Sequence, residues 1–207
     1  MADPFRERTE ADKIRARYAS QAKVIQERPD LNDRGRDQRL SGVLVQARKD
    51  MAALRKFEAE QIEARRRHLQ QRLFGNPKSG DSAAVISFRD ALDRADRLQS
   101  PDEAAALLDC AVMSGDDILG RAIAMRAMAR VSVKGVGDGW RQVVERWVDG
   151  QPSGTIEEVQ ELIDLEHSSS DIKSRFAQGL AYSLPTPGRL RGRDIERLAV
   201  EAENLPG

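Results

Sequence analysis

The chain has 207 residues, of which 40% are hydrophobic, 33% are charged and only 4% are aromatic, and its 34 basic and 34 acidic residues give a formal net charge of zero. The single cysteine excludes an internal disulfide, and no stretch approaches the ~18 consecutive apolar residues of a membrane-spanning helix. The residues after Met1 are charged, so we expect no secretory signal. A core of Leu, Ile, Val, Met and Ala suits helix packing better than sheets, and the composition therefore predicts a soluble, cytoplasmic, all-α protein.

The net charge of zero hides a division along the chain. Residues 1–80 hold 19 Lys+Arg and 12 Asp+Glu, a net charge of +7, whereas residues 81–207 hold 15 and 22, a net charge of −7. This division predicts a basic N-terminal part and an acidic C-terminal part.

A first short helix is predicted to begin at Thr9, whose hydroxyl can cap the first helical amides. Apolar side chains then follow one helical stripe at Ile14, Tyr18, Ala22 and Ile25. The stripe stops before Pro29, and residues 28–33 have the Pro, Asp and Asn content of a turn. The pattern predicts the first arm of a helical hairpin.

A long amphipathic helix is predicted from about residue 37 to residue 74. Its apolar face, typical of helix packing or of a coiled-coil seam, consists of Leu40, Leu44, Ala47, Met51, Leu54 and Phe57. At 1.5 Å per residue such a helix is ~55 Å long, more than the first helix can cover, so we expect part of it to project. The face is interpreted as a protein interface, and packing against Ile14, Tyr18 and Ile25 of the same chain remains the alternative. A kink at Gly42 also stays open.

A strong helix stop follows the long helix. Gly75 suits a left-handed C-cap, and Asn76-Pro77 forbids continuation. The sign of the charge changes at the same place. We therefore predict a domain of residues 1–78 with the basic N-terminal helices and an acidic helical domain of residues 79–207.

The second domain has the pattern of about seven short helices, packed as a bundle or as a short α-solenoid. They are expected near residues 82–98, 101–114, 116–131 and 140–150, from residue 155 through Ile163, and near residues 170–183 and 193–204. Ser100 to Glu103 and Thr155 to Glu158 have the pattern of capping boxes. Trp140 and Trp147, seven residues apart, are expected to pack in the core.

No motif with catalytic or metal-binding chemistry stands out. His68 and His167 have no neighbouring ligand, and Cys110 lies among Leu107, Leu108 and Ala111, so we interpret it as a buried structural thiol. The carboxylate pairs, such as Asp116-Asp117, fit the first turns of helices. We expect no enzymatic activity, no metal and no cofactor.

Basic side chains are the best candidates for a binding site. Arg65, Arg66, Arg67 and Arg72 form a basic patch late in the long helix, and Arg34, Arg36 and Arg39 form another at its start. Such a patch can neutralise phosphates of a nucleic acid, and it can equally dock on an acidic protein surface. Arg189, Arg191 and Arg193, after a Pro-Gly turn, are expected to lie in a solvated loop.

In its helical character and its Arg- and Ala-rich composition, the whole chain resembles the small helical virion structural proteins of phages that infect GC-rich actinobacteria. No motif carries the resemblance. It implies oligomerisation or docking on portal, capsid or tail subunits, with the host cytoplasm and the virion as locations. The sequence thus favours a structural or assembly protein that contacts other protein subunits, with a nucleic-acid-associated protein as the alternative and no membrane partner.

Overall fold

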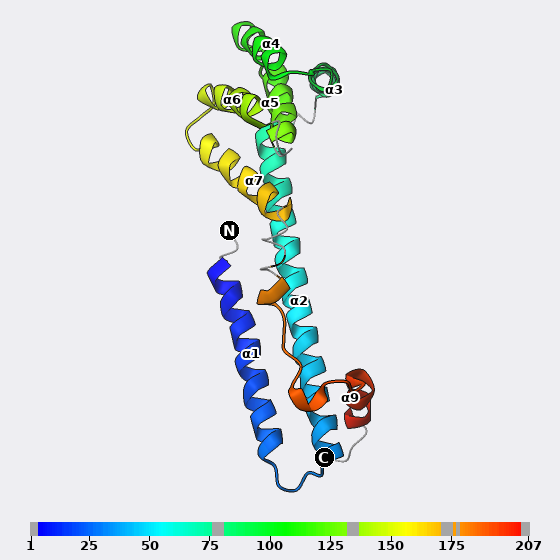
Figure 1. Ribbon diagram of the computed structural model, residues 1–207. Coiled ribbons are helices and arrows are strands. Elements are labelled where there is room, and N and C mark those ends of the chain that lie inside the picture. Colours follow the sequence, from blue (N-terminus) through cyan, green and yellow to red (C-terminus); the bar gives the residue numbers. More distant parts are fainter. Residues whose placement is uncertain (1–3, 76–80, 132–136, 171–175, 177–178, 204–207) are drawn as a thin grey trace. The chain divides into compact units, whose positions relative to one another are not determined.

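The computed structural model describes residues 4–75, 81–131, 137–170, 176 and 179–203 (Figure 1). Among these residues all regular structure is helical, which confirms the all-α prediction and the long second helix. The helices are α1 (Pro4–Glu27), α2 (Asp33–Phe74), α3 (Ser82–Asp96), α4 (Pro101–Ser114), α5 (Asp117–Val131), α6 (Gly137–Asp149), α7 (Thr155–Ser170) and α9 (Ile195–Glu203), with a 3₁₀ turn, η1 (Gly188–Leu190).

The predicted ends of α4 and the start of α5 are confirmed by their capping contacts, whereas Gly75 after α2 does not adopt the predicted left-handed conformation. The Glu103 N–H donates to the Ser100 hydroxyl at 3.2 Å, as the predicted capping box requires, and the Glu103 carboxylate accepts from the N–H of Gln99, one residue before the N-cap, at 3.0 Å. Gly115 ends α4 in the left-handed conformation with φ 68°, which glycine adopts without steric cost. Asp116 accepts the Leu119 N–H at 3.0 Å at the start of α5.

Three local predictions need correction or fall outside the described residues. Helix α1 begins at Pro4 rather than at Thr9, since proline is favoured in a first helical turn. Thr155 donates its hydroxyl to the Pro152 carbonyl at 2.8 Å, an alternative to the predicted cap. Half of the predicted helix 170–183 lies outside the described residues, and Phe176 and residues 179–181 are helical.

The chain forms two compact units, and their boundaries differ from the predicted boundary at residue 78. Unit 1 consists of residues 1–63 and 172–207, and unit 2 consists of residues 64–171. The end of α2 belongs to unit 2 because Leu69, Leu73 and Phe74 are buried in that unit's core. The C-terminal residues belong to unit 1 because Leu184, Leu190 and Ile195 are buried there.

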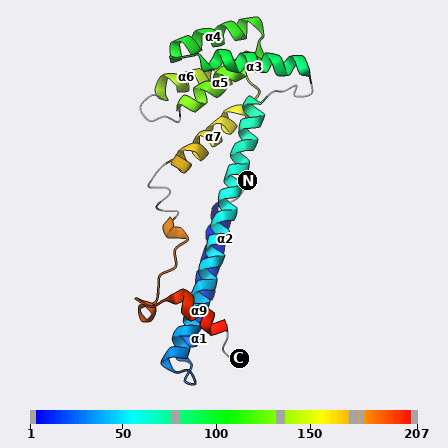
Figure 2. The same cartoon turned by 90° about the vertical axis from the view of Figure 1, so that its right-hand side faces the viewer.

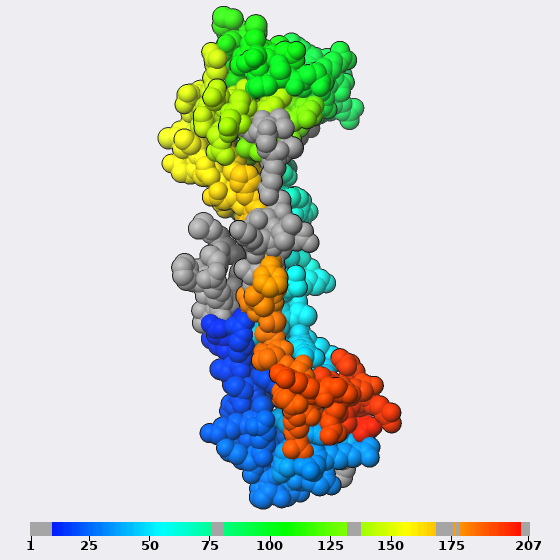
Figure 3. Space-filling view, viewed as in Figure 1, coloured from blue at the N-terminus to red at the C-terminus, as the bar shows by residue number. Residues whose placement is uncertain are grey.

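Unit 1 is built on the antiparallel pair α1 and α2. The apolar stripe of α1, including Ala11, Tyr18 and Ala22, packs against α2 together with the C-terminal residues. Both views place α9 beside the first part of α2, where a Cβ on Gly42 would lie 3.7 Å from the Ala202 Cβ (Figure 2). The space-filling view shows the C-terminal residues, orange to red, lying against the helices of this unit (Figure 3). A third layer therefore covers α2 where the sequence predicted only two.

Unit 2 is a bundle arranged around α5, which contacts α3, α4 and α6. Both tryptophans are buried in its core, as predicted, and the Phe74 and Trp147 rings lie with centroids 5.5 Å apart. Phe74 thus joins the last turn of α2 to α6.

Phe74→Ala should lower the free energy of unfolding of unit 2 by about 3–5 kcal/mol, because it removes a buried aromatic ring and leaves a cavity beside Trp147. Both tryptophans lie in unit 2, so chemical denaturation followed by tryptophan fluorescence reports on this unit. Phe57→Ala, the same change at an exposed position of the same helix, is the control and should shift the midpoint little. Equal shifts in the two variants would contradict the assignment of Phe74 to the core.

Candidate functional site

The structure places most of the predicted protein interface of α2 inside unit 1. Leu40, Leu44, Ala47 and Met51 are buried in its core, and Leu54 is half-buried against it. Their partners are α1 and the C-terminal residues, so the interpretation as an intermolecular interface is corrected in favour of packing within the chain. Of the six predicted residues, only Phe57 keeps an exposed side chain.

Two arginines of the predicted basic patch form ion pairs with carboxylates of α7. Arg65 binds the Glu161 carboxylate with two hydrogen bonds, Nε at 2.8 Å and Nη2 at 2.7 Å. Arg72 pairs with Glu158 at 3.0 Å. Arg66 and Arg67 also have interactions within the chain. Two of the four arginines therefore fasten α7 to the last turns of α2, and much of their charge is balanced within unit 2.

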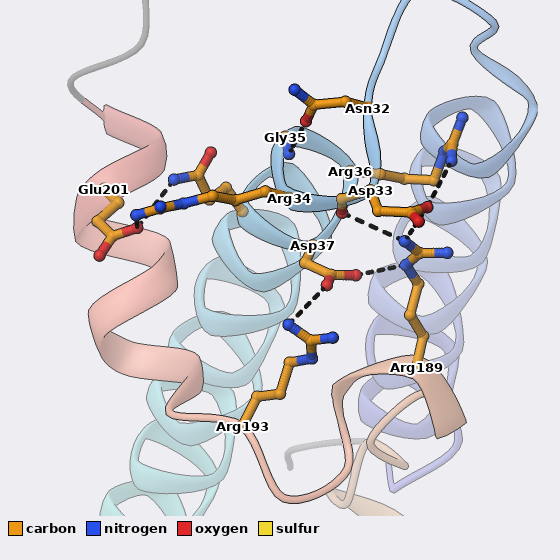
Figure 4. Close-up of polar contacts among 10 residues, drawn as sticks. Asn32, Asp33, Arg34, Gly35, Arg36, Asp37, Arg189, Arg193 and Glu201 are labelled. Carbon is orange, nitrogen blue, oxygen red and sulfur yellow. Dashed lines mark hydrogen bonds and ion pairs between the residues drawn. The ribbon is translucent and has the colours of Figure 1, made fainter.

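The centre of the polar contacts in unit 1 is Asp37, whose side chain is only 2% exposed (Figure 4). Arg189 binds Asp37 through Nε and binds Asp33 through Nη2 at 2.6 Å. Arg193 binds the second Asp37 oxygen at 3.1 Å. A buried carboxylate needs such charged partners, because an unpaired one would be strongly destabilising. Two of the three arginines predicted for a solvated loop, Arg189 and Arg193, therefore anchor the C-terminal residues to α2, and Arg191 is exposed.

A second carboxylate, Glu201 of α9, extends this network. It accepts from Arg34 at 3.0 Å and from Gln38 at 2.8 Å, both on the first turns of α2, and from Arg197 of its own helix at 3.2 Å. Arg36 instead donates to the Arg28 and Leu31 carbonyls at 2.9 and 3.0 Å and so fixes the turn between α1 and α2. Two of the three arginines predicted as a patch at the start of α2 thus have structural contacts.

These contacts lower the pKa values of the carboxyl groups. The hydrogen bonds from Arg189 lower the pKa of Asp33, and those from Gln38 and Arg34 lower the pKa of Glu201. In unit 2 the hydrogen bonds from Arg65 lower the pKa of Glu161 below its ordinary 4.5. A lowered pKa means that the folded state favours the ionised form, so each pair stabilises the fold at neutral pH.

The remaining ionisable candidates do not converge on one point. Among the described residues no group of three or more His, Cys, Asp and Glu side chains is placed to hold a metal ion. His68 and His167 are exposed. Cys110 is exposed as well, which corrects the prediction of a buried thiol: α4 turns Leu108 and Ala111 inward and Cys110 outward.

Helix α4 presents apolar side chains on the surface of unit 2. Ala104, Leu108 and Ala111 face the core, whereas Ala106, Cys110, Val112 and Met113 are exposed. Val112 and Met113 keep 68% and 80% of their surface exposed. The sequence contained this signal, since the segment from Ala104 to Met113 is apolar all round with the exception of Asp109.

Comparison with known protein families, curated proteins and solved structures gives no match to this chain. Within the described part of the chain, no helix has both the length and the apolar character needed to cross a lipid bilayer.

Arg189→Ala should lower the free energy of unfolding of unit 1, because the buried Asp37 carboxylate then keeps only Arg193 as a charged partner. Chemical denaturation followed by circular dichroism measures the change. Arg191→Ala, an exposed arginine of the same turn, is the control and should have little effect. If Arg191→Ala destabilises the protein as much, the Asp37 contacts are not the cause.

Unit 2 should lose stability as the pH falls below 4.5, the ordinary pKa of Glu161. The sign follows from the lowered pKa: the stabilisation is complete above the ordinary value and disappears as the carboxylate is protonated in the folded state. Glu161→Gln should therefore flatten the acid limb of a stability curve followed by tryptophan fluorescence. Glu157→Gln, on the exposed side of α7, should leave this limb unchanged. A wild-type acid limb in Glu161→Gln would argue against the Arg65 contact.

Proposed function

We propose that this chain is a structural or assembly protein that acts through protein–protein contacts. The observation that supports the proposal best is the outer side of α4, where Met113 is exposed with Ala106 and Cys110, and Val112 is exposed on an adjacent side. Ala106, Cys110 and Met113 follow one another at steps of four and three residues and so share one side of the helix.

An exposed face of this kind is unfavourable in water. A helix with apolar residues on all sides is normally buried, and contiguous exposed apolar patches mark interaction surfaces. Burial of such side chains against a partner removes apolar area from water and stabilises the complex by ~25 cal/mol per Å². The face of α4 therefore suits a protein partner better than solvent.

Unit 1 supports the same proposal with separate apolar side chains. Phe57 on α2 is exposed, and so are Phe176 and Leu180, four residues apart. Large exposed aromatic and aliphatic side chains of this kind often serve as anchors in protein interfaces.

The resemblance to helical phage virion proteins suggests the kind of assembly in which the protein acts. We propose association with copies of the chain or docking on a larger assembly, such as the head–tail junction, capsid or tail of a virion. The nucleic-acid alternative has less support, because Arg65 and Arg72 of the basic patch already pair with Glu161 and Glu158.

Photochemical cross-linking tests the proposal directly. A photoreactive phenylalanine analogue in place of Met113 should give a discrete covalent adduct with another protein molecule in cells that produce the native assembly. The same analogue in place of Asp93, an exposed polar residue of α3, is the control and should give far less adduct. The absence of an adduct at position 113, or equal yields at the two positions, would contradict the proposal.

A further inference from the structure

The surface of unit 1 contains a hollow between α2 and the residues near Tyr182. Its lining includes three cations, Arg48, Arg55 and Lys56, and small side chains, Ala52 and Ala59, and none of the described lining residues is a carboxylate. The small side chains leave room between the longer basic ones. We call this feature the cationic hollow.

The positive charge of the cationic hollow is only partly balanced within the chain. Arg48 donates to the uncharged Thr186 hydroxyl at 2.7 Å, and Lys56 lies 3.8 Å from Glu60 in an exposed pair that contributes little. In the described part of the chain Arg55 pairs with no carboxylate. The nearby Glu58 carboxylate accepts a hydrogen bond from the Tyr182 hydroxyl. The hollow therefore suits an anionic partner.

Unit 2 has a surface of opposite charge on α7. Glu158 and Glu161 face α2 and pair with Arg72 and Arg65. Glu157 and Asp164 are exposed, and none of the described cations pairs with either. Ile156, also exposed, adds an apolar side chain to this face. We call Ile156, Glu157, Gln160 and Asp164 the acidic face of α7.

The two surfaces match in spacing as well as in sign. Arg48 and Arg55 are seven residues apart on α2, and Glu157 and Asp164 are seven residues apart on α7. Two helical turns separate each pair by about 10 Å, so two helices packed side by side can bring both opposite-charge pairs together. The net charges of the two units are opposite as well. Unit 1 holds 20 Lys+Arg and 16 Asp+Glu and is basic, whereas unit 2 holds 14 and 18 and is acidic.

We propose that a second copy of this chain is one of its partners, and that the acidic face of α7 in one copy docks in the cationic hollow of the next. The inference rests on the proposed assembly function and names a partner for it. The two surfaces differ, so a pair of copies still has one unused hollow and one unused acidic face. Such a head-to-tail contact produces rings or extended polymers rather than only dimers.

Charge reversal tests the pairing. Arg55→Glu with Lys56→Glu reverses the hollow, and Glu157→Lys with Asp164→Lys reverses the acidic face. All four side chains are exposed, so both variants should keep wild-type circular dichroism. In sedimentation experiments at low salt, wild-type protein should form oligomers larger than dimers that dissociate as salt rises. Each variant alone should associate about tenfold or more weakly, because attraction becomes repulsion.

Mixing the two variants should restore association, since every reversed surface then finds an opposite one. Lys13→Glu with Lys23→Glu, which changes the net charge of unit 1 equally on exposed positions of α1, is the control and should associate like wild type. Any of three results would overturn the pairing. The wild-type protein could stay monomeric, only one of the two charge reversals could weaken association, or the mixture of the two variants could fail to associate. A monomer that still gives the cross-linked adduct at position 113 would leave the assembly function intact and overturn only this inference.

Discussion

Coverage of the apolar side of α2 is the constraint on which both units depend. An exposed stripe of Leu40, Leu44 and Met51 would be costly in water, and so would Leu69 and Phe74 near the end of the same helix. Helix α1 and the C-terminal residues cover the first group, and the bundle around α5 covers the second. One helix therefore supplies part of each hydrophobic core, and the candidate binding surfaces are what remains outside these two cores.

Local sequence signals predicted the elements of this fold well. The periodic apolar residues located the helices, and Ser100 and Gly115 located the ends of α4, because helix periodicity and caps depend on residues within a few positions of one another. The partner of each apolar face was harder to predict. The stripe from Leu40 to Phe57 looks the same whether α1, another molecule or the C-terminal residues cover it. The change in charge sign near residue 78 marked the end of α2 but not the boundary of a packing unit.

The partners of the charged side chains were even harder to predict from the sequence than the partners of the apolar faces. Asp37 and Arg189 are 152 residues apart, and Arg65 and Glu161 are 96 residues apart, so no spacing rule connects them. From the sequence alone, Arg65 and Arg189 are surplus positive charges. In the fold each guanidinium meets a carboxylate from a distant segment, and the basic patch becomes a structural contact. The charges that remain for recognition, such as Arg55 and Asp164, are those that the fold leaves on the exposed sides of the same helices.

The discontinuous make-up of unit 1 also affects how the protein is made. Synthesis runs from the N-terminus, so the residues of unit 2 are synthesised before Leu184, Leu190 and Ile195. At about 5–20 residues per second, the 152 residues between Asp37 and Arg189 take roughly 8–30 s to translate. During that delay the Leu40 and Leu44 side chains lack part of their cover and Asp37 lacks its arginines. The nascent chain therefore exposes part of this apolar surface until its last residues are made, and a product truncated before Leu184 would expose it permanently.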